Sequence, residues 1–161
     1  MSKNLFFLCP TDCLESVINN AFKNENYFYT SLGNSVTSDI KTVEHIKKLI
    51  IKYNIDNLYF VLSDHNQIIL DALGRQLFLD TRGLNDTYKQ LVIQKQYTDE
   101  LWRKENHQFV VLSYFLNKKV KAFQDVLNID VTISGKIFKK RENMFRNIYS
   151  DLICLERHAL N

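Results

Sequence analysis

Five consecutive polar residues follow a short apolar run and have side chains that could bind a small ligand. The run is residues 58–62 (LYFVL), and the residues after it are Ser63, Asp64, His65, Asn66 and Gln67. A carboxylate at the end of a buried strand, beside hydroxyl and amide groups, can hold a small molecule through hydrogen bonds. Asp64 would play this part. Because neighbouring side chains on an extended segment point to opposite sides, the sequence leaves open whether Asp64 or His65 faces the pocket.

Cys9 is a second residue with potential chemistry, because it also ends an apolar run. Residues 5–9 (LFFLC) are stopped by Pro10, and a helix is expected directly after them. A thiol at the N-terminus of a helix is more readily deprotonated and can act as a nucleophile. A small buried residue is the more frequent role of a cysteine in such a run, so both roles stay open.

Three β-prone runs, residues 5–9, 27–30 and 58–62, must position these side chains. The first and third are continuous apolar runs, which is typical of strands that are buried on both faces of a parallel sheet. A helix with one apolar face is expected from residue 38 or 39 to about residue 53, between the second run and the third. The chain therefore predicts strands of a parallel sheet joined by helices.

The carboxyl ends of these strands should meet at one edge of the sheet. Two parallel strands joined by a helix form a right-handed crossover, which returns the chain to the same edge. The Gly33-Asn34 pair after the second run tolerates positive φ and lets the chain turn sharply. Cys9, this turn and Asp64-His65 should then converge where open parallel sheets bind their ligands.

The remaining segments predict further helices and one more strand. Asp12 and Glu15 fit a capping box at the start of the first helix. Gly135 would mark a bulge in a late strand. The expected elements are a helix or the start of one over residues 67–73, one long or two broken helices over residues 85–127, a helix over residues 143–160 and a strand over residues 131–138.

Composition is that of an ordinary globular protein. The 161 residues are 45% hydrophobic and 24% charged, which suits a single domain over residues 1–161. Three cysteines and no secretory signal indicate a reducing, cytoplasmic setting. No apolar run approaches the roughly 18 residues of a membrane helix. The net charge of +3 comes from scattered basic residues and does not predict nucleic-acid binding.

The order of these features resembles the β-class carbonic anhydrases. In that family the first strand ends in Cys-x-Asp-x-Arg, an Ala-Gly-Asn turn follows the second strand, and the third strand ends in Gly-His-x-x-Cys. This chain has Cys9, then Leu32-Gly33-Asn34, then residues 62–67 (LSDHNQ), in the same order. The late helix and strand also look like those of the family. The resemblance implies an α/β fold of three layers, with a mostly parallel central sheet and flanking helices.

The resemblance also implies where zinc would bind. The two Cys and the His that bind zinc in the family fall on Cys9, Gln67 and Asp64. Zinc prefers thiolate and imidazole ligands. A better set would be Cys9, Asp64 and His65, with Cys13 as a second thiolate, and it requires His65 to turn inward. The turn residues Gly33 and Asn34, together with Gln67, would contribute to cofactor or ligand binding.

The catalytic pair of the family is altered as well. Its Asp and Arg fall on Thr11 and Cys13, and Asp12 lies one residue away. The resemblance therefore leaves Asp12 and Asp64 as the candidate catalytic residues.

We expect a divergent β-carbonic-anhydrase-like protein that has lost the zinc hydration site and binds a small molecule, an anion or a protein partner. The alternative is a zinc-dependent lyase, a carbonate dehydratase, in which zinc-bound hydroxide attacks carbon dioxide through an altered ligand set. Members of the family are dimers or larger oligomers, so the resemblance implies a homodimer. Tyr97, Leu101 and Trp102 form an apolar patch that would either dock their helix or contact another subunit.

Overall fold

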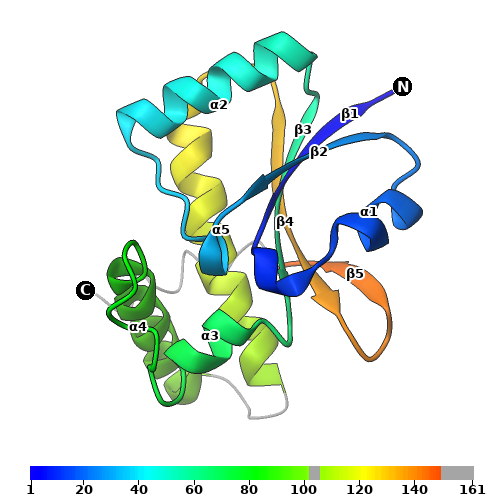
Figure 1. The fold of residues 1–161 in the computed structure, drawn as a ribbon. Coiled ribbons are helices and arrows are strands. Elements are labelled where there is room, and N and C mark those ends of the chain that lie inside the picture. Colours follow the sequence, from blue (N-terminus) through cyan, green and yellow to red (C-terminus); the bar gives the residue numbers. More distant parts are fainter. Residues whose placement is uncertain (102–105, 150–161) are drawn as a thin grey trace.

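A computed structural model describes residues 1–101 and 106–149. The centre of this described part is a five-stranded sheet with the order β2-β1-β3-β4-β5 (Figure 1). Strands β1 to β4 are parallel, and β5 runs antiparallel to β4. The strands are β1 (Lys3–Leu8), β2 (Glu25–Thr30), β3 (Asn57–Ser63), β4 (Thr132–Lys139) and β5 (Met144–Asn147).

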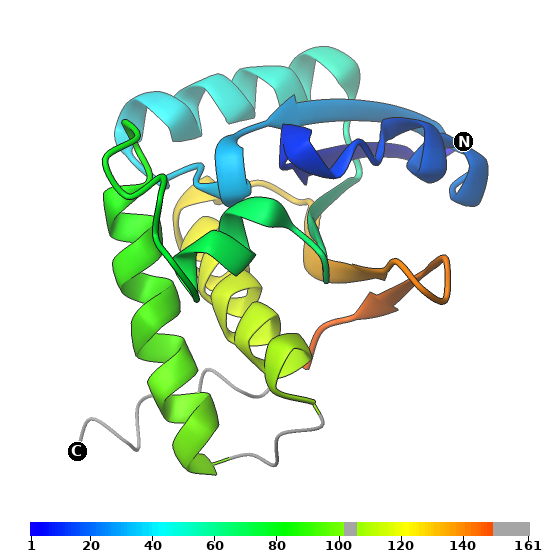
Figure 2. The same cartoon turned by 60° about the horizontal axis from the view of Figure 1, so that its bottom comes forward.

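Helices cover both faces of the sheet. The described helices are α1 (Glu15–Ala21), α2 (Ile40–Tyr53), α3 (Gln67–Ala72), α4 (Asn85–Leu101) and α5 (His107–Leu127). Helices α2 and α5 pack on one face and α1 on the other, which gives three layers (Figure 1). Helix α4 lies beside α5, on the side away from the sheet (Figure 2). None of the described helices is long and apolar enough to cross a membrane.

The two central strands are apolar because both of their faces are covered. Phe7 of β1 and Phe60 of β3 are fully buried and stack with ring centroids 4.5 Å apart, in the core beneath α2 and α5. Phe6 points to the opposite face and packs with α1 residues. Side chains alternate between faces along a strand, so a strand covered on both sides must be apolar at every position. The predicted buried strands are confirmed.

Helix α2 begins where its sequence predicts. The Asp39 side chain caps the helix by accepting a hydrogen bond from the backbone N–H of Thr42, at 3.0 Å. Val43, Ile46 and Ile50 face the sheet and are buried. The helix delivers the chain from the edge strand β2 back to β3, on the far side of β1.

The predicted capping box at Asp12 is wrong. Asp12 ends the one-turn helix Pro10–Asp12, and α1 begins only at Glu15. Between them Cys13 has φ 52°, a left-handed conformation that breaks the helix. The Asp12 side chain is free of the cap because it bonds instead to the end of β3, a contact that the local sequence does not specify.

Two predictions near the end of the described chain are also corrected. The segment Met144–Asn147 is strand β5 and not the start of a helix, because Asn143, at φ 51°, reverses the chain so that it pairs with β4. Gly135 marks no bulge, since β3 and β4 pair without interruption. A Cβ at Gly135 would lie 2.6 Å from Ile148 Cδ1, so close packing explains this glycine. Trp102 and residues 150–160 of the expected last helix lie outside the described residues.

Candidate functional site

The carboxyl ends of β1 and β3 and the turn after β2 meet at one edge of the sheet, as the topology predicts. The N–H of Ser31 donates to the carbonyl of Leu8, at 2.9 Å, and so holds the end of β2 beside the end of β1. The N–H of Asp64 donates to the carbonyl of Phe138, at 3.0 Å, and joins β3 to β4 in the same way. This edge brings together residues that are far apart in the sequence.

Cys9 lies at this edge but faces the interior. Its side chain is 1% exposed, and Sγ accepts a hydrogen bond from the backbone N–H of Gly33, at 3.1 Å. The Thr11 hydroxyl lies 3.0 Å from the same sulfur. Since α1 begins at Glu15, Cys9 precedes only the one-turn helix. The basis for thiolate activation by a following helix is therefore absent, and the contacts fit a buried structural thiol.

Gly33 and Asn34 fasten the turn after β2 to the sheet. The Asn34 side chain is fully buried, and its Nδ2 donates to the carbonyls of Phe7 (2.9 Å) and Val61 (3.0 Å). One amide thus joins β1 to β3. Gly33 has φ 60°, and a Cβ there would lie 2.8 Å from Ile68 Cγ2. Gly33 and Asn34 therefore hold the turn after β2 in place against β1, β3 and α3.

Both carboxylate oxygens of Asp12 accept hydrogen bonds from residues at or just after the end of β3. Its Oδ2 accepts the backbone N–H of Ser63, and its Oδ1 accepts Asn66 Nδ2, each at 2.9 Å. Burial raises the pKa of Asp12 to about 6, although these two hydrogen bonds oppose the shift. Asp12 therefore changes charge near neutral pH, which is a frequent property of functional sites.

Asn66 connects this carboxyl to helix α3. The residue is fully buried, and its Oδ1 caps α3 by accepting the N–H of Ile69, at 2.9 Å. Its amide N–H group is then left to donate to Asp12. The position of Asp12 is thus coupled to the start of α3.

Asp64 and His65 bond to each other and to the neighbouring strand. His65 Nδ1 donates to Asp64 Oδ1 at 2.7 Å, and the backbone N–H of Lys140 donates to the same oxygen at 3.1 Å. Gln108 Nε2 donates to the Asp64 carbonyl. The Asp64 carboxylate is thus turned toward β4, whereas the His65 ring is exposed. With Nδ1 held by Asp64, the Nε2 atom of His65 is left for other partners.

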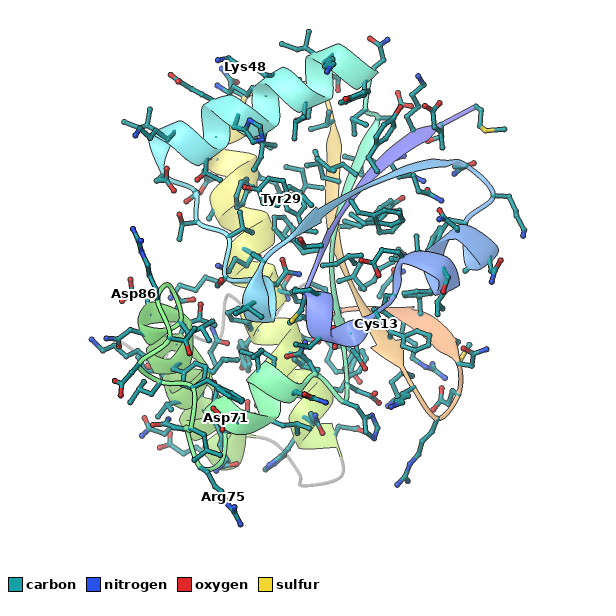
Figure 3. The ribbon with its side chains drawn as sticks, in the orientation of Figure 1. Cys13, Tyr29, Lys48, Asp71, Arg75 and Asp86 are labelled. Carbon is teal, nitrogen blue, oxygen red and sulfur yellow. The ribbon has the colours of Figure 1, made fainter. Side chains whose placement is uncertain are left out.

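A pocket of about 340 Å³ opens at this edge, and we call it the site pocket. It lies beside the segment that joins β1 to α1, which carries Cys13 (Figure 3). A larger hollow of about 630 Å³ lies between α5 and β4, away from Asp12. We choose the smaller pocket because polar groups from several elements and a titrating carboxyl converge on it. The polar residues among those that line it are Thr11, Asp12, Cys13, Ser63, His65, Gln67, Lys140 and Asn143.

Solved structures show which known fold this architecture matches. The β-carbonic anhydrase CafA of the fungus Aspergillus fumigatus has a TM-score of 0.70 at 12% identity, covering 92% of this chain and 76% of that chain. Tetrameric β-carbonic anhydrases of Sordaria macrospora give 0.67 at 14% identity, with 91% and 80% covered. The fold is that of the β-carbonic anhydrases. The CafD enzyme of Aspergillus fumigatus gives 0.64 at 15% identity, with 92% and 90% covered.

No protein-family model matches the chain, and no curated protein matches it in sequence at a significant level. The likeness to β-carbonic anhydrases is therefore one of fold, and it confirms the predicted fold class. What the chain does must be inferred from its own residues.

Cys9, Asp64 and Gln67 are the residues that the sequence resemblance predicts at the positions of the zinc ligands of β-carbonic anhydrases. Cys9 Sγ accepts a hydrogen bond from the turn residue Gly33, and Asp64 accepts one from the backbone of Lys140 after β4. Gln67 is exposed and lines the site pocket. Cys13, the other thiol of the wider predicted set, is exposed and its Sγ lies 3.5 Å from the Pro10 carbonyl. Within residues 1–101 and 106–149, no three His, Cys, Asp or Glu side chains lie together so as to hold a metal ion.

Sequence reasoning did not anticipate the roles of Asn66, Lys140 and Asn143. Lys140 and Asn143 follow β4, a strand that the alternation of residues 131–138 predicts. Because β4 is parallel to β3, its carboxyl end reaches the same edge, and this is the signal that could have found both residues. Asn66 carries no comparable signal, since its contact with Asp12 joins residues 54 positions apart.

Proposed function

We propose that this chain is a β-carbonic-anhydrase-fold protein that lacks the zinc hydration site and binds a small polar ligand in the site pocket. The observation that carries the proposal is the arrangement around Asp12. The half-buried carboxyl of Asp12, with a pKa of about 6, lines one pocket together with His65, Gln67 and Lys140. Such a convergence of polar groups is typical of ligand sites.

The chemistry of the donors argues against zinc at the position that the fold would use. Zinc sites in proteins take four ligands, mostly thiolates and imidazoles. Here the matching residues offer one thiol, one carboxylate and one amide. The thiol already accepts a hydrogen bond from Gly33, and the carboxylate accepts two at Oδ1. This set does not fit the metal, so we derive no zinc-dependent step.

The first experiment measures zinc by elemental analysis on protein purified without chelator or metal-affinity tag, and then carbon dioxide hydration by stopped flow. We expect far less than one zinc per chain and no hydration above the uncatalysed rate. About one zinc per chain together with measurable carbon dioxide hydration would refute the proposal that the zinc site is lost. It would favour the lyase with an altered ligand set.

Ligand binding is tested by thermal stabilisation, because a compound that binds only the folded state raises the melting temperature. A panel of small acids, amines, sugars and nucleotides is screened against the wild type and against Gln67→Leu, which removes an exposed amide from the pocket. Lys48→Gln, on the outer side of α2, is the control (Figure 3). A compound that stabilises the wild type and K48Q more than Q67L supports the pocket. Equal stabilisation of all three proteins would place binding elsewhere.

We also propose that the chain forms a homodimer. The Sordaria macrospora proteins of this fold are tetrameric. Strand β2 is an edge of the described sheet, and its open backbone groups could pair with another strand. Light scattering coupled to size exclusion tests this proposal, and a mass of one chain at all concentrations would refute it.

A further inference from the structure

Strand β4 has an open edge over its first half. Strand β5 pairs only with Lys136–Lys139, whereas β4 begins at Thr132 and extends past β5, upward in Figure 1. The last bond between the two segments joins the N–H of Ile148 to the carbonyl of Gly135, at 3.3 Å. The chain then turns to α5, which holds Tyr149 through a hydrogen bond. No described strand therefore covers the edge of β4 before Gly135.

The backbone of Ile133 points out of this open edge. Alternate residues of a strand direct their N–H and C=O groups to opposite sides. The N–H of Thr132 donates to the carbonyl of Asp56 at 3.1 Å, toward β3, and the carbonyl of Gly135 faces the other way, toward Ile148. Ile133 faces the same way as Gly135. Neither its N–H nor its C=O has a hydrogen-bond partner within residues 1–101 and 106–149. The edge thus offers one donor and one acceptor to an added strand.

A groove runs along this edge, with α5 as its other wall, and we call it the edge groove. Two hollows form it, one of about 630 Å³ beside Gly135 and one of about 340 Å³ nearer the start of β4, and Gln124 and Ile133 line both. Val120 and Leu127 make its α5 wall apolar. An open strand edge of this kind can accept an extended peptide, which adds a strand to the sheet and places alternate side chains in pockets.

The edge groove also carries a cation without a carboxylate partner. Lys136 lines it and is half-buried, with Nζ 5.4 Å from the ring centroid of Tyr59. Nζ donates to Asn147 Oδ1 at 2.8 Å, and Lys136 forms no ion pair within the part of the chain that the structure describes. An ammonium has three donors, so two remain. A carboxylate beside Lys136 would gain both charge compensation and a strong hydrogen bond.

We propose that the edge groove binds an extended peptide as an added strand, with an acidic side chain of the peptide on Lys136 and apolar side chains against α5. The peptide backbone bonds to the N–H and C=O of Ile133. Because side chains alternate along a strand, acidic and apolar residues of the peptide alternate as well. The other lysine of the groove, Lys121, is paired with Asp125 at 3.1 Å, so Lys136 supplies the free positive charge. This surface is separate from the site pocket and does not depend on a ligand there.

The test uses NMR on the isotope-labelled full chain, with the synthetic peptide acetyl-Val-Glu-Val-Glu-Val-amide as the probe. In the free protein, the amide of Ile133 should exchange with solvent about 10-fold faster or more than that of Ser134, which faces β3. The peptide should shift the amide signals of residues 131–135. At saturation it should slow the exchange of Ile133 about 5-fold or more, because the amide gains a hydrogen-bond acceptor.

Matched peptides and variants isolate the backbone contact from the charge contact. A probe methylated at every backbone nitrogen cannot donate to the carbonyl of Ile133, and it should bind about 5-fold more weakly or less still. Exchanging both Glu of the probe for Gln should weaken binding to the wild type about 5-fold, and this preference should vanish in Lys136→Gln. Lys136→Arg should keep the preference. Lys48→Gln, on the outer side of α2, is the control and should also keep it (Figure 3).

Each result supports the inference or overturns it. Slow exchange of Ile133 in the free protein would overturn it, because the edge would already be covered, by a second copy if light scattering gives the mass of two chains. Equal binding of the methylated probe would exclude strand addition, and a Glu preference that persists in K136Q would exclude the charge contact. No shift at residues 131–135 with about 5 mM probe would also refute it. The Glu preference of the wild type needs no substitution, so its absence is decisive even if K136Q does not fold.

Discussion

The pH dependence of stability offers a direct test of how deeply Asp12 is buried. Its pKa is raised from 3.8 to about 6 in the folded protein. A group whose folded pKa is raised stabilises the protein below its unfolded pKa, and this stabilisation is lost as pH rises through the folded pKa. For Asp12 the window is therefore from about pH 4 to pH 7, and the wild type should lose stability across it.

The shift sets the size of the effect. Raising the pKa of one group from 3.8 to about 6 corresponds to about 3 kcal/mol between the two limits, of which about 2 kcal/mol falls between pH 4.5 and pH 7.5. Asp12→Asn removes the titrating group and keeps the shape. It loses one hydrogen bond, because its amide cannot accept from Asn66, at a cost of about 1 kcal/mol that does not vary with pH.

The assay is urea denaturation of the wild type and D12N at pH 4.5, 6.0 and 7.5, with a further measurement at pH 3.0 for the wild type and the control variant. Because all other groups titrate alike in both proteins, the difference in free energy of unfolding isolates Asp12. Relative to wild type, D12N should gain about 2 kcal/mol over this range. Asp39→Asn is the control of opposite sign, since hydrogen bonds from Thr37 and Thr42 lower the pKa of Asp39 to about 2. The difference in free energy of unfolding between D39N and the wild type should be constant above pH 5 and should shrink below pH 4. A D12N difference that changes by less than about 0.5 kcal/mol would refute the reasoning.

Three further predictions concern the framework of the site. Gly33→Ala should lower the free energy of unfolding by about 2 kcal/mol or more in urea denaturation, because its φ is 60° and the new Cβ would meet Ile68 Cγ2 at 2.8 Å. Asn34→Ala should cost about 2 kcal/mol by the same assay, since one amide donates to carbonyls of both β1 and β3. Asp71→Ala should speed hydrogen exchange of the amides of residues 77–78, which donate to its carboxylate; Figure 3 marks Asp71, and unchanged exchange would contradict the assignment.

Much of the architecture follows from local pattern. Residues 5–9 and 58–62 are apolar at every position, and only a strand with both faces covered needs such a run. The stripe of Val43, Ile46 and Ile50, with Asp39 before it, specifies α2 and its start. Once these elements are placed, the handedness of crossovers brings Cys9, the Gly33-Asn34 turn and Asp64 to one edge. The observed contacts at that edge agree with this order.

The errors occur where a distant contact outweighs a local preference. The spacing of Asp12 and Glu15 in the sequence fits a capping box. In the structure, however, the carboxyl of Asp12 accepts hydrogen bonds from Ser63 and Asn66, and it does not cap α1. Met144, Ile148, Leu152 and Leu155 have helical spacing in the sequence, yet pairing with β4 determines the conformation of residues 144–147. Gly135 suggested a bulge, and the reason for it is the approach of Ile148.

The sequence by itself determined the fold class and the edge of the sheet where chemistry could occur, because periodicity and strand order are encoded residue by residue. Only the tertiary structure decided which side chains face the site pocket. It turned Asp64 toward the backbone of Lys140 and buried Cys9 against Gly33, and it made Asp12 the titrating group through contacts with residues more than 50 positions away. Orientation and burial depend on those partners, and the pKa of a carboxyl depends on both.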